Sequence, residues 1–141
     1  MLQKGQDESI LRVVLEALLD GVAAVDPQGR VLFVNNAMAR LLGFKDAHNL
    51  PELALREVLS RLEAYTDDGV ALPFDERPLI RALRGETVND IALTIRQPLQ
   101  GRSFEVINSA FPIFAVDGSV RMAVIRMRDV TDQRRALREL K

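Results

Sequence analysis

The sequence predicts an α+β domain with an antiparallel sheet and several short helices. The hydrophobic periods give the order helix, two strands, several short helices, three strands and a final helix. Strands and helices are thus grouped along the chain, which is typical of α+β folds and not of doubly wound parallel sheets. The chain has 141 residues, 48% of them hydrophobic, so it is long enough to bury a single core.

The N-terminal part predicts a loose stretch over residues 1–8 and then an amphipathic helix. Ser9 can cap that helix, which would run from Ile10 to Leu19. Its apolar residues recur at helical spacing: Ile10, Val13, Val14, Ala17 and Leu18. We expect this stripe either to cover the outer face of the sheet or to pair with a second copy of the chain.

Residues 22–34 predict a β-hairpin, because two β-branched apolar runs flank the turn sequence Asp-Pro-Gln-Gly. Asn35 follows the second run and can cap a short helix that starts at Asn36 and ends before Gly43. The apolar face of that helix would consist of Met38, Leu41 and Leu42.

Two further helices are predicted in the middle of the chain. The first would begin near Pro51 and reach about Glu63, before a turn at residues 66–69. The second would run over residues 76–84, with Asp75 as its cap. Its inward side chains would be Leu79, Ile80 and Leu83.

Three strands and a charged helix are predicted to complete the domain. The strands cover residues 87–96, 102–111 and 119–128, and the first of them alternates apolar and polar side chains. The segment from Asp129 to Asp132 then opens a helix over residues 133–141. Its apolar residues have coiled-coil-like spacing, although the segment is too short to establish a heptad repeat.

The composition excludes several classes of protein and site. The chain has 19 Lys and Arg against 20 Asp and Glu, so it lacks the basic excess of a nucleic-acid-binding protein. It has no cysteine, which excludes a thiolate nucleophile and a cysteine-based zinc site. No apolar run is long enough to span a membrane or to act as a signal peptide, so we expect a cytoplasmic protein with no metal site.

Four stretches of sequence follow one another at suitable spacing: 20–31, 33–44, 69–86 and 129–132. Together they resemble the PAS family of sensor domains, over about residues 9–134. The resemblance implies a five-stranded antiparallel sheet whose helices enclose a small pocket. It divides the chain into a flexible start at 1–8, a PAS domain at 9–131 and the start of a signalling helix at 132–141.

The resemblance also limits which cofactors the chain could bind. PAS domains that form a flavin photoadduct or carry a thioester-linked chromophore need a cysteine, and this chain has none. Haem-binding relatives use a histidine on the helix predicted at residues 76–84, which has none. The single histidine, His48, is expected on the surface. A non-covalent flavin or an organic acid stays open, so the cofactor is unknown.

The pocket implied by the resemblance would be lined by inward residues of the helices and sheet. These candidates are Leu41, Leu42, Leu79, Leu83, Ile91, Leu93, Phe104, Val106, Asn108 and Met122. They could equally fill the core without any ligand. Asn108 would need a hydrogen-bond partner if buried, and Arg77 could meet a ligand carboxylate or lie exposed. Asp129 and Thr131 are candidates for a signal joint, or else for an ordinary cap.

Three functions compete at this point. The first is a sensory, homodimeric module of a bacterial two-component histidine kinase or diguanylate cyclase, with the effector domain beyond Lys141. The second is a ligand-free module for protein interaction and dimerisation. The third, a small enzyme, would need an acid or base in the pocket. Because Asp90 and Glu105 are expected outside it, we predict a chain without catalytic residues.

Overall fold

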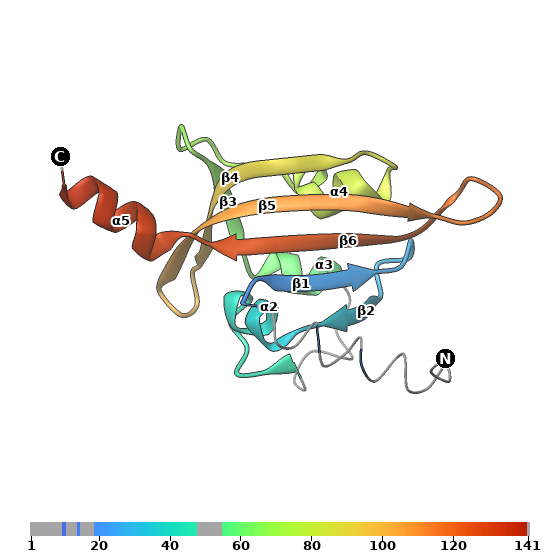
Figure 1. Cartoon of the computed structure of the whole chain (residues 1–141), viewed down its shortest axis with the longest axis horizontal. Coiled ribbons are helices and arrows are strands. Elements are labelled where there is room, and N and C mark those ends of the chain that lie inside the picture. The colour runs from blue at the N-terminus through green and yellow to red at the C-terminus, as the bar shows by residue number, and fades with distance from the viewer. Residues whose placement is uncertain (1–9, 11–13, 15–18, 48–54, 141) are drawn as a thin grey trace.

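The computed structural model describes residues 19–47 and 55–140, together with Ile10 and Val14. It contains a six-stranded antiparallel sheet with the strand order β2-β1-β6-β5-β4-β3 (Figure 1). The strands are β1 (Gly21–Val25), β2 (Val31–Val34), β3 (Glu63–Thr66), β4 (Val88–Gln97), β5 (Arg102–Phe114) and β6 (Val120–Asp129). The predicted α+β class and the antiparallel sheet are confirmed.

The helices lie on one face of this sheet, with the exception of α5, which leaves from the end of β6 (Figure 1). The helical elements are α2 (Asn36–Leu41), α3 (Leu55–Ser60), the short 3₁₀ turn η2 (Phe74–Glu76), α4 (Pro78–Leu83) and α5 (Thr131–Glu139). We call the helix-covered side of the sheet the inner face and the opposite side the outer face. None of the helices in residues 19–47 and 55–140 is long and apolar enough to cross a membrane.

The hairpin β1–β2 forms as predicted, and Asn35 caps α2. Oδ1 of Asn35 accepts hydrogen bonds from the backbone N–H groups of Met38 and Val22, each at 2.9 Å. Its Nδ2 donates to the carbonyl of Asp20 at 3.0 Å. The side chain is fully buried. Asn35 therefore does more than cap a helix, because it also fixes the N-terminus of α2 to β1.

The predicted helix that ends near Glu63 is wrong at its C-terminal end. Helix α3 stops at Ser60, and residues 63–66 form β3, which pairs with β4 at the edge of the sheet. The buried Leu62 and Ala64 alternate with half-exposed neighbours, as a strand requires. Pairing with β4, which is distant in the sequence, thus outweighs the helical spacing of the apolar residues in this segment. The sheet has six strands where five were predicted.

The predicted cap of the next helix is also wrong. Asp75 lies inside η2, and α4 begins at Pro78 with Arg77 as the flanking residue. Proline suits the first position of a helix because its missing N–H would have no partner there. The chain therefore enters α4 through a 3₁₀ turn and a proline, without a side-chain cap.

Strands β4, β5 and β6 supply most of the inner face. A bulge at Asp90, whose φ is +50°, shifts the register between Val88 and Ile91. On β6 the buried residues are Ala123, Ile125 and Met127. Met122 alternates with them and faces outward, so its predicted place in the pocket lining is wrong.

Parts of the predictions lie outside the described residues. Of the predicted helix from Ile10 to Leu19, only Ile10, Val14 and Leu19 are described; the first two are helical and exposed. His48 and the predicted helix start at Pro51 also lie outside.

Candidate functional site

A small apolar cavity lies between the inner face of the sheet and the helices. Its volume is about 50 Å³, and no polar residue contributes to its wall. The lining residues are Ala23, Val25, Val31, Val34, Met38, Leu42, Val58, Leu59, Leu79, Ile125 and Met127. Pockets for organic ligands usually measure roughly 300–1,000 Å³. In this conformation the core is therefore nearly closed, and an organic ligand would have to displace side chains to enter.

Two of the residues predicted to line the pocket, Leu42 and Leu79, do line this cavity. Four others are buried in the surrounding core: Leu41, Leu93, Val106 and Asn108. Three are partly buried and pack against that core: Leu83, Ile91 and Phe104. Whether any of them binds a ligand stays a prediction.

The sequence analysis did not identify the residues of β1 and β6 that line the cavity, among them Val25, Ile125 and Met127. Alternation along β1 could have identified Val25. On β6, apolar residues occupy both faces in turn, so Met122 and Val124 give the same signal as Ile125 and Met127. The hydrophobic pattern therefore carries no information about which set faces inward.

Arg77 does not line the cavity but anchors the backbone beside it. Its Nη1 donates to the carbonyl of Leu59 at 2.9 Å, and its Nη2 donates to that of Leu62 at 2.8 Å. The side chain is half-buried, and this burial lowers the pKa of its guanidinium group. Arg77 thus holds the end of α3 and the approach to β3 against the start of α4.

Asn108 leaves one polar atom inside the core without a partner. The residue is 2% exposed and lies opposite Met127 on the neighbouring strand. Its Oδ1 is buried and accepts no hydrogen bond from the described residues. Such an atom costs free energy unless a donor reaches it, so a water molecule or a ligand N–H or O–H group would be stabilised there.

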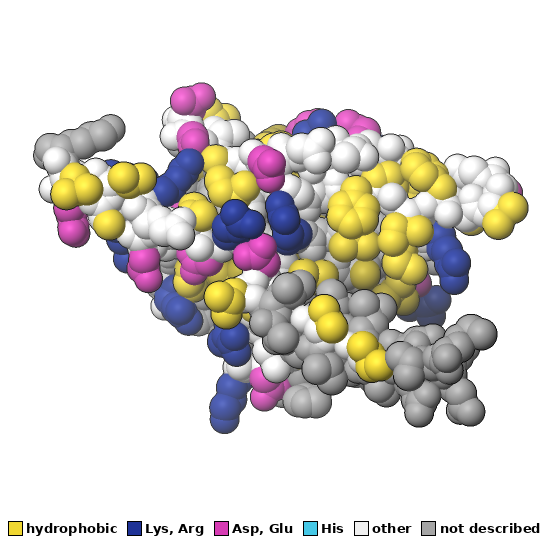
Figure 2. All heavy atoms as spheres, in the orientation of Figure 1, with side chains coloured by type: hydrophobic (Ala, Val, Ile, Leu, Met, Phe, Trp, Pro, Cys, Tyr) yellow, Lys and Arg dark blue, Asp and Glu magenta, His cyan; other side chains and the backbone are white. Residues whose placement is uncertain are grey.

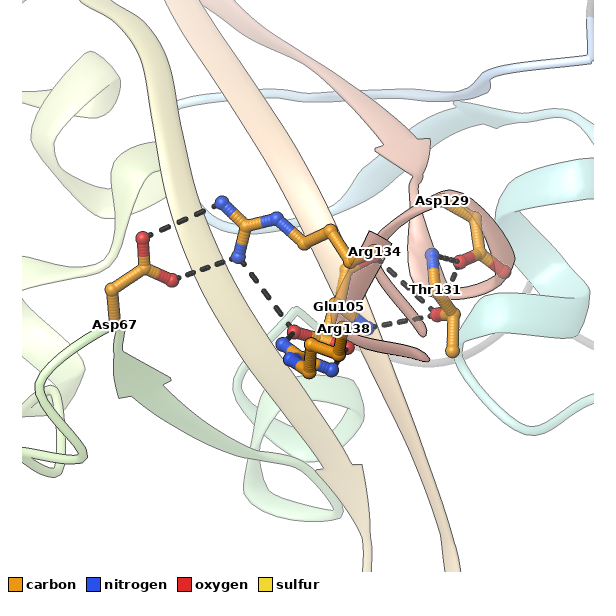
Figure 3. Close-up of polar contacts among 6 residues, drawn as sticks. All are labelled: Asp67, Glu105, Asp129, Thr131, Arg134 and Arg138. Carbon is orange, nitrogen blue, oxygen red and sulfur yellow. Dashed lines mark hydrogen bonds and ion pairs between the residues drawn. The ribbon is translucent and has the colours of Figure 1, made fainter. Parts of the chain in front are cut away.

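The predicted joint at the end of the sheet forms a compact set of hydrogen bonds (Figure 3). The carboxylate of Asp129 accepts hydrogen bonds from the backbone N–H of Thr131, at 2.9 Å, and from its hydroxyl group. The hydroxyl oxygen accepts from the backbone N–H of Glu105 at 2.9 Å. The N–H of Val130 donates to the carbonyl of Glu105 at 2.8 Å. The first turn of α5 is therefore attached directly to β5.

A group of ion pairs holds α5 at a second place, as Figure 3 also shows. The Glu105 carboxylate binds Arg138, and Arg134 lies 3.7 Å from it while pairing with Asp67 at 3.0 Å. The hydrogen bond from Arg138 is the main reason that the pKa of Glu105 is lowered, with the charges of Arg134 and Arg135 adding to it. Helix α5 thus contacts both β5 and the turn after β3.

The outer face of the sheet carries an apolar patch. Figure 2 shows hydrophobic side chains gathered over one half of this face and charged side chains over the other half. The outer apolar patch consists of Ala24, Phe111, Ile113, Met122 and Val124, with Phe111 opposite Val124 and Ile113 opposite Met122. Phe111 and Ile113 are 41% and 37% exposed. Exposed apolar side chains that adjoin one another on a sheet are candidates for contact with another protein.

The residues at 19–47 and 55–140 bring together no group of three or more side chains that could hold a metal ion. The cavity lining also contains no histidine, methionine-histidine pair or tyrosine suited to bind a haem iron.

The family model for the PAS fold matches residues 15–135 of the chain. Among curated proteins, the chain is 24% identical over 143 residues to the probable diguanylate cyclase DgcE of Escherichia coli K12. The alignment covers 96% of the chain but 12% of that protein. The chain thus corresponds to a small part of its relative.

Solved structures of sensor domains share the same fold. The PAS domain of Bordetella pertussis BvgS has a TM-score of 0.62 at 18% identity, over 96% of this chain and 94% of that one. The PAS domain of nitrogen regulation protein NR(II) from Vibrio parahaemolyticus has a TM-score of 0.58 at 19% identity, over 85% and 97%. At these identities the likeness concerns the fold.

Proposed function

The chain belongs to the PAS fold family of sensory domains, and we propose that it regulates an effector domain attached at its C-terminal side. The observation that carries this proposal is the attachment of α5 to the sheet. Thr131, the first residue of α5, bonds both to Asp129 and to the backbone of Glu105 in β5. A change in the sheet would alter these bonds and so the direction of the helix that leads onward.

The proposed input is a small-molecule signal in the core cavity, a change in dimerisation, or both. A ligand would bias the joint by the difference in its affinity for two states of the domain. Asn108 does not line the cavity, so its unpartnered Oδ1 would meet a hydrogen-bond donor of the ligand only where the ligand displaces core side chains. A cysteine-linked chromophore has no attachment point in the sequence, and the apolar cavity wall contains no histidine that could bind a haem iron.

The alternative is a ligand-free module for protein interaction and dimerisation. The volume of the cavity, about 50 Å³, favours this alternative because the core is nearly filled by its own side chains. If the chain has this function, the outer apolar patch is the surface that binds the other protein, and ligand screens detect no molecule bound in the core.

We propose that the outer apolar patch contributes to a homodimer. Its two cross-strand pairs, Phe111 with Val124 and Ile113 with Met122, give a continuous apolar surface that a second copy could match. The predicted apolar stripe of the N-terminal helix would add to the same interface.

Sedimentation velocity tests the dimer. Ile113→Ser should shift the dimer toward monomer, whereas Ile107→Ser, on the same strand and face but outside the patch, should not. Removal of residues 1–19 should weaken association further. Dimers that withstand Ile113→Ser would contradict the proposed interface.

The effector is proposed from the relatives. DgcE is described as a probable diguanylate cyclase, and PAS structures of a two-component sensor histidine kinase share the fold. We propose a bacterial, cytoplasmic signalling protein of one of these two kinds, with no catalytic residue in the chain itself.

A further inference from the structure

A second hollow lies outside the core, where α2, the start of β5 and the end of β6 meet. Its volume is about 230 Å³, several times that of the core cavity. The lining residues are Leu19, Ala37, Arg40, Leu41, Arg102, Phe104 and Asp129. Four of these residues are apolar, and the other three are two cations and one carboxylate.

Both arginines are available to a ligand. Neither Arg40 nor Arg102 forms an ion pair in the described part of the chain, although every ion pair found between described residues involves an arginine. The guanidinium carbon of Arg102 lies 4.9 Å from the ring centre of Phe104, which also lines the hollow. Stacking of this kind fixes the orientation of a guanidinium group while leaving its N–H donors free.

The backbone segments that carry the two arginines are also tied together. Gln97, at the end of β4, is 1% exposed and donates from Nε2 to the carbonyl groups of Arg40 and Leu41. Gln97 lies opposite Arg102 in the β4–β5 pairing. The last turn of α2 is thus tied to the strand pair that carries Arg102, so the two cations do not depend on a mobile loop for their position.

Asp129 completes the set of polar groups. Its Oδ1 accepts both hydrogen bonds from Thr131, and its second carboxylate oxygen has no partner among the described residues. A purely anionic ligand would be repelled by this carboxylate. A ligand that combines an anionic and a cationic group would satisfy the arginines and Asp129 together.

We propose that this hollow binds a free α-amino acid with an aliphatic side chain. Its carboxylate binds Arg40 and Arg102, its ammonium group binds Asp129, and its side chain lies against Leu41 and Phe104. The volume, about 230 Å³, suits a molecule of this size, and each charged group of the lining meets an opposite charge on the ligand. The site is separate from the core cavity and contacts the signal joint directly through Asp129.

A ligand in this hollow would act directly on the hydrogen bonds between Asp129 and Thr131. An amino acid on Asp129 would change the charge around the carboxylate that holds the N–H and hydroxyl of Thr131. The ligand would thus act on the start of α5 without any opening of the core.

A titration of the ¹⁵N-labelled chain with L-leucine, followed by amide chemical shifts, tests the proposal. We expect saturable shifts at residues 37–41, 102–104 and 129–131. Arg40→Gln and Arg102→Gln should each weaken binding about tenfold, as expected for the loss of a charged hydrogen-bond partner. Arg121→Gln is the matched control, because Arg121 is exposed and lies away from the hollow.

Two comparison ligands test whether binding needs both charged groups of the amino acid. The acid 4-methylpentanoate lacks the ammonium group and 3-methylbutylamine lacks the carboxylate, so both should bind at least about tenfold more weakly than leucine. Equal binding of either compound would overturn the assignment. Shifts confined to core residues such as Ala23 and Met127, or leucine binding unchanged in Arg102→Gln, would also overturn this site, while leaving the proposed sensory function intact.

Discussion

The backbone N–H of Glu105 in β5 donates a hydrogen bond of 2.9 Å to Oγ1 of Thr131, the first residue of α5. This bond joins residues 26 positions apart and connects the middle of the sheet to the helix that leaves the domain. This hydrogen bond is therefore one of the contacts that fix the start of α5 on β5.

Thr131→Val keeps the shape of the side chain and removes this acceptor. We expect the free energy of unfolding to fall by about 1–2 kcal/mol, because the amide of Glu105 loses its partner. Hydrogen exchange at that amide should become faster. Thr87→Val, at an exposed threonine before β4, is the control. Equal stability of the two variants in urea would contradict the role given to Thr131.

Asn35 should be more important to stability than a surface helix cap. Its side chain is fully buried and makes hydrogen bonds with Val22, Met38 and Asp20. Asn35→Ala should therefore lower the free energy of unfolding by about 3 kcal/mol, because two backbone N–H groups lose their acceptor. Urea denaturation measures this loss. Asn89→Ala, at an exposed asparagine, should change stability by less than about 0.5 kcal/mol.

Arg77 should behave as a structural residue. Arg77→Met keeps the aliphatic stem but leaves the carbonyl groups of Leu59 and Leu62 without donors. We expect a loss of about 1.5–3 kcal/mol in the free energy of unfolding. The matched variant Arg121→Met removes an exposed arginine and should leave the thermal midpoint nearly unchanged. A stable Arg77→Met protein with altered ligand binding would instead support the ligand role that the sequence suggested.

The ion pairs of Glu105 predict a dependence of stability on pH. The pKa of this carboxyl group is lowered in the folded protein, chiefly by the hydrogen bond from Arg138. The folded state therefore favours the ionised form. The contribution is fully present above the ordinary pKa of a glutamate side chain, near 4.5, and is lost as the pH falls through the lower pKa of the folded protein.

Glu105→Gln should remove this part of the acid sensitivity. The difference in unfolding free energy between neutral and acidic solution should shrink in the variant, and added salt should affect α5 less. Glu139→Gln, near the end of α5, is the control. An unchanged pH profile in Glu105→Gln would show that the pairs with Arg134 and Arg138 contribute nothing to stability.

Local patterns in the sequence were enough to predict much of the fold. The hairpin and the cap at Asn35 depend on residues that are neighbours in the chain, so turn chemistry and helix capping identify them. Strand β3 could not be found in this way. Its four residues, Glu63–Thr66, become a strand because they pair with β4, some 30 positions later.

The site was predicted less completely, for two physical reasons. Met122 and Met127 look alike in the sequence, and only the register of β6 against β5 decides which one faces inward. Arg77 binds carbonyl groups that lie 15 and 18 positions earlier in the chain, which no local pattern indicates. The contact between Asp129 and Thr131 could be predicted because the two residues are close in the sequence, and their role as a signal joint stays a prediction.

The most direct test of the proposed function is native mass spectrometry of the freshly purified chain, compared with its denatured mass and its ultraviolet-visible spectrum. The account predicts a dimer, or a reproducible extra mass that is lost on denaturation, or both. A dimer at the unliganded mass would favour the interaction module, whereas an extra mass would identify a signal molecule. A monomer at the unliganded mass across the concentration range would contradict the proposal that this domain works through ligand binding or dimerisation.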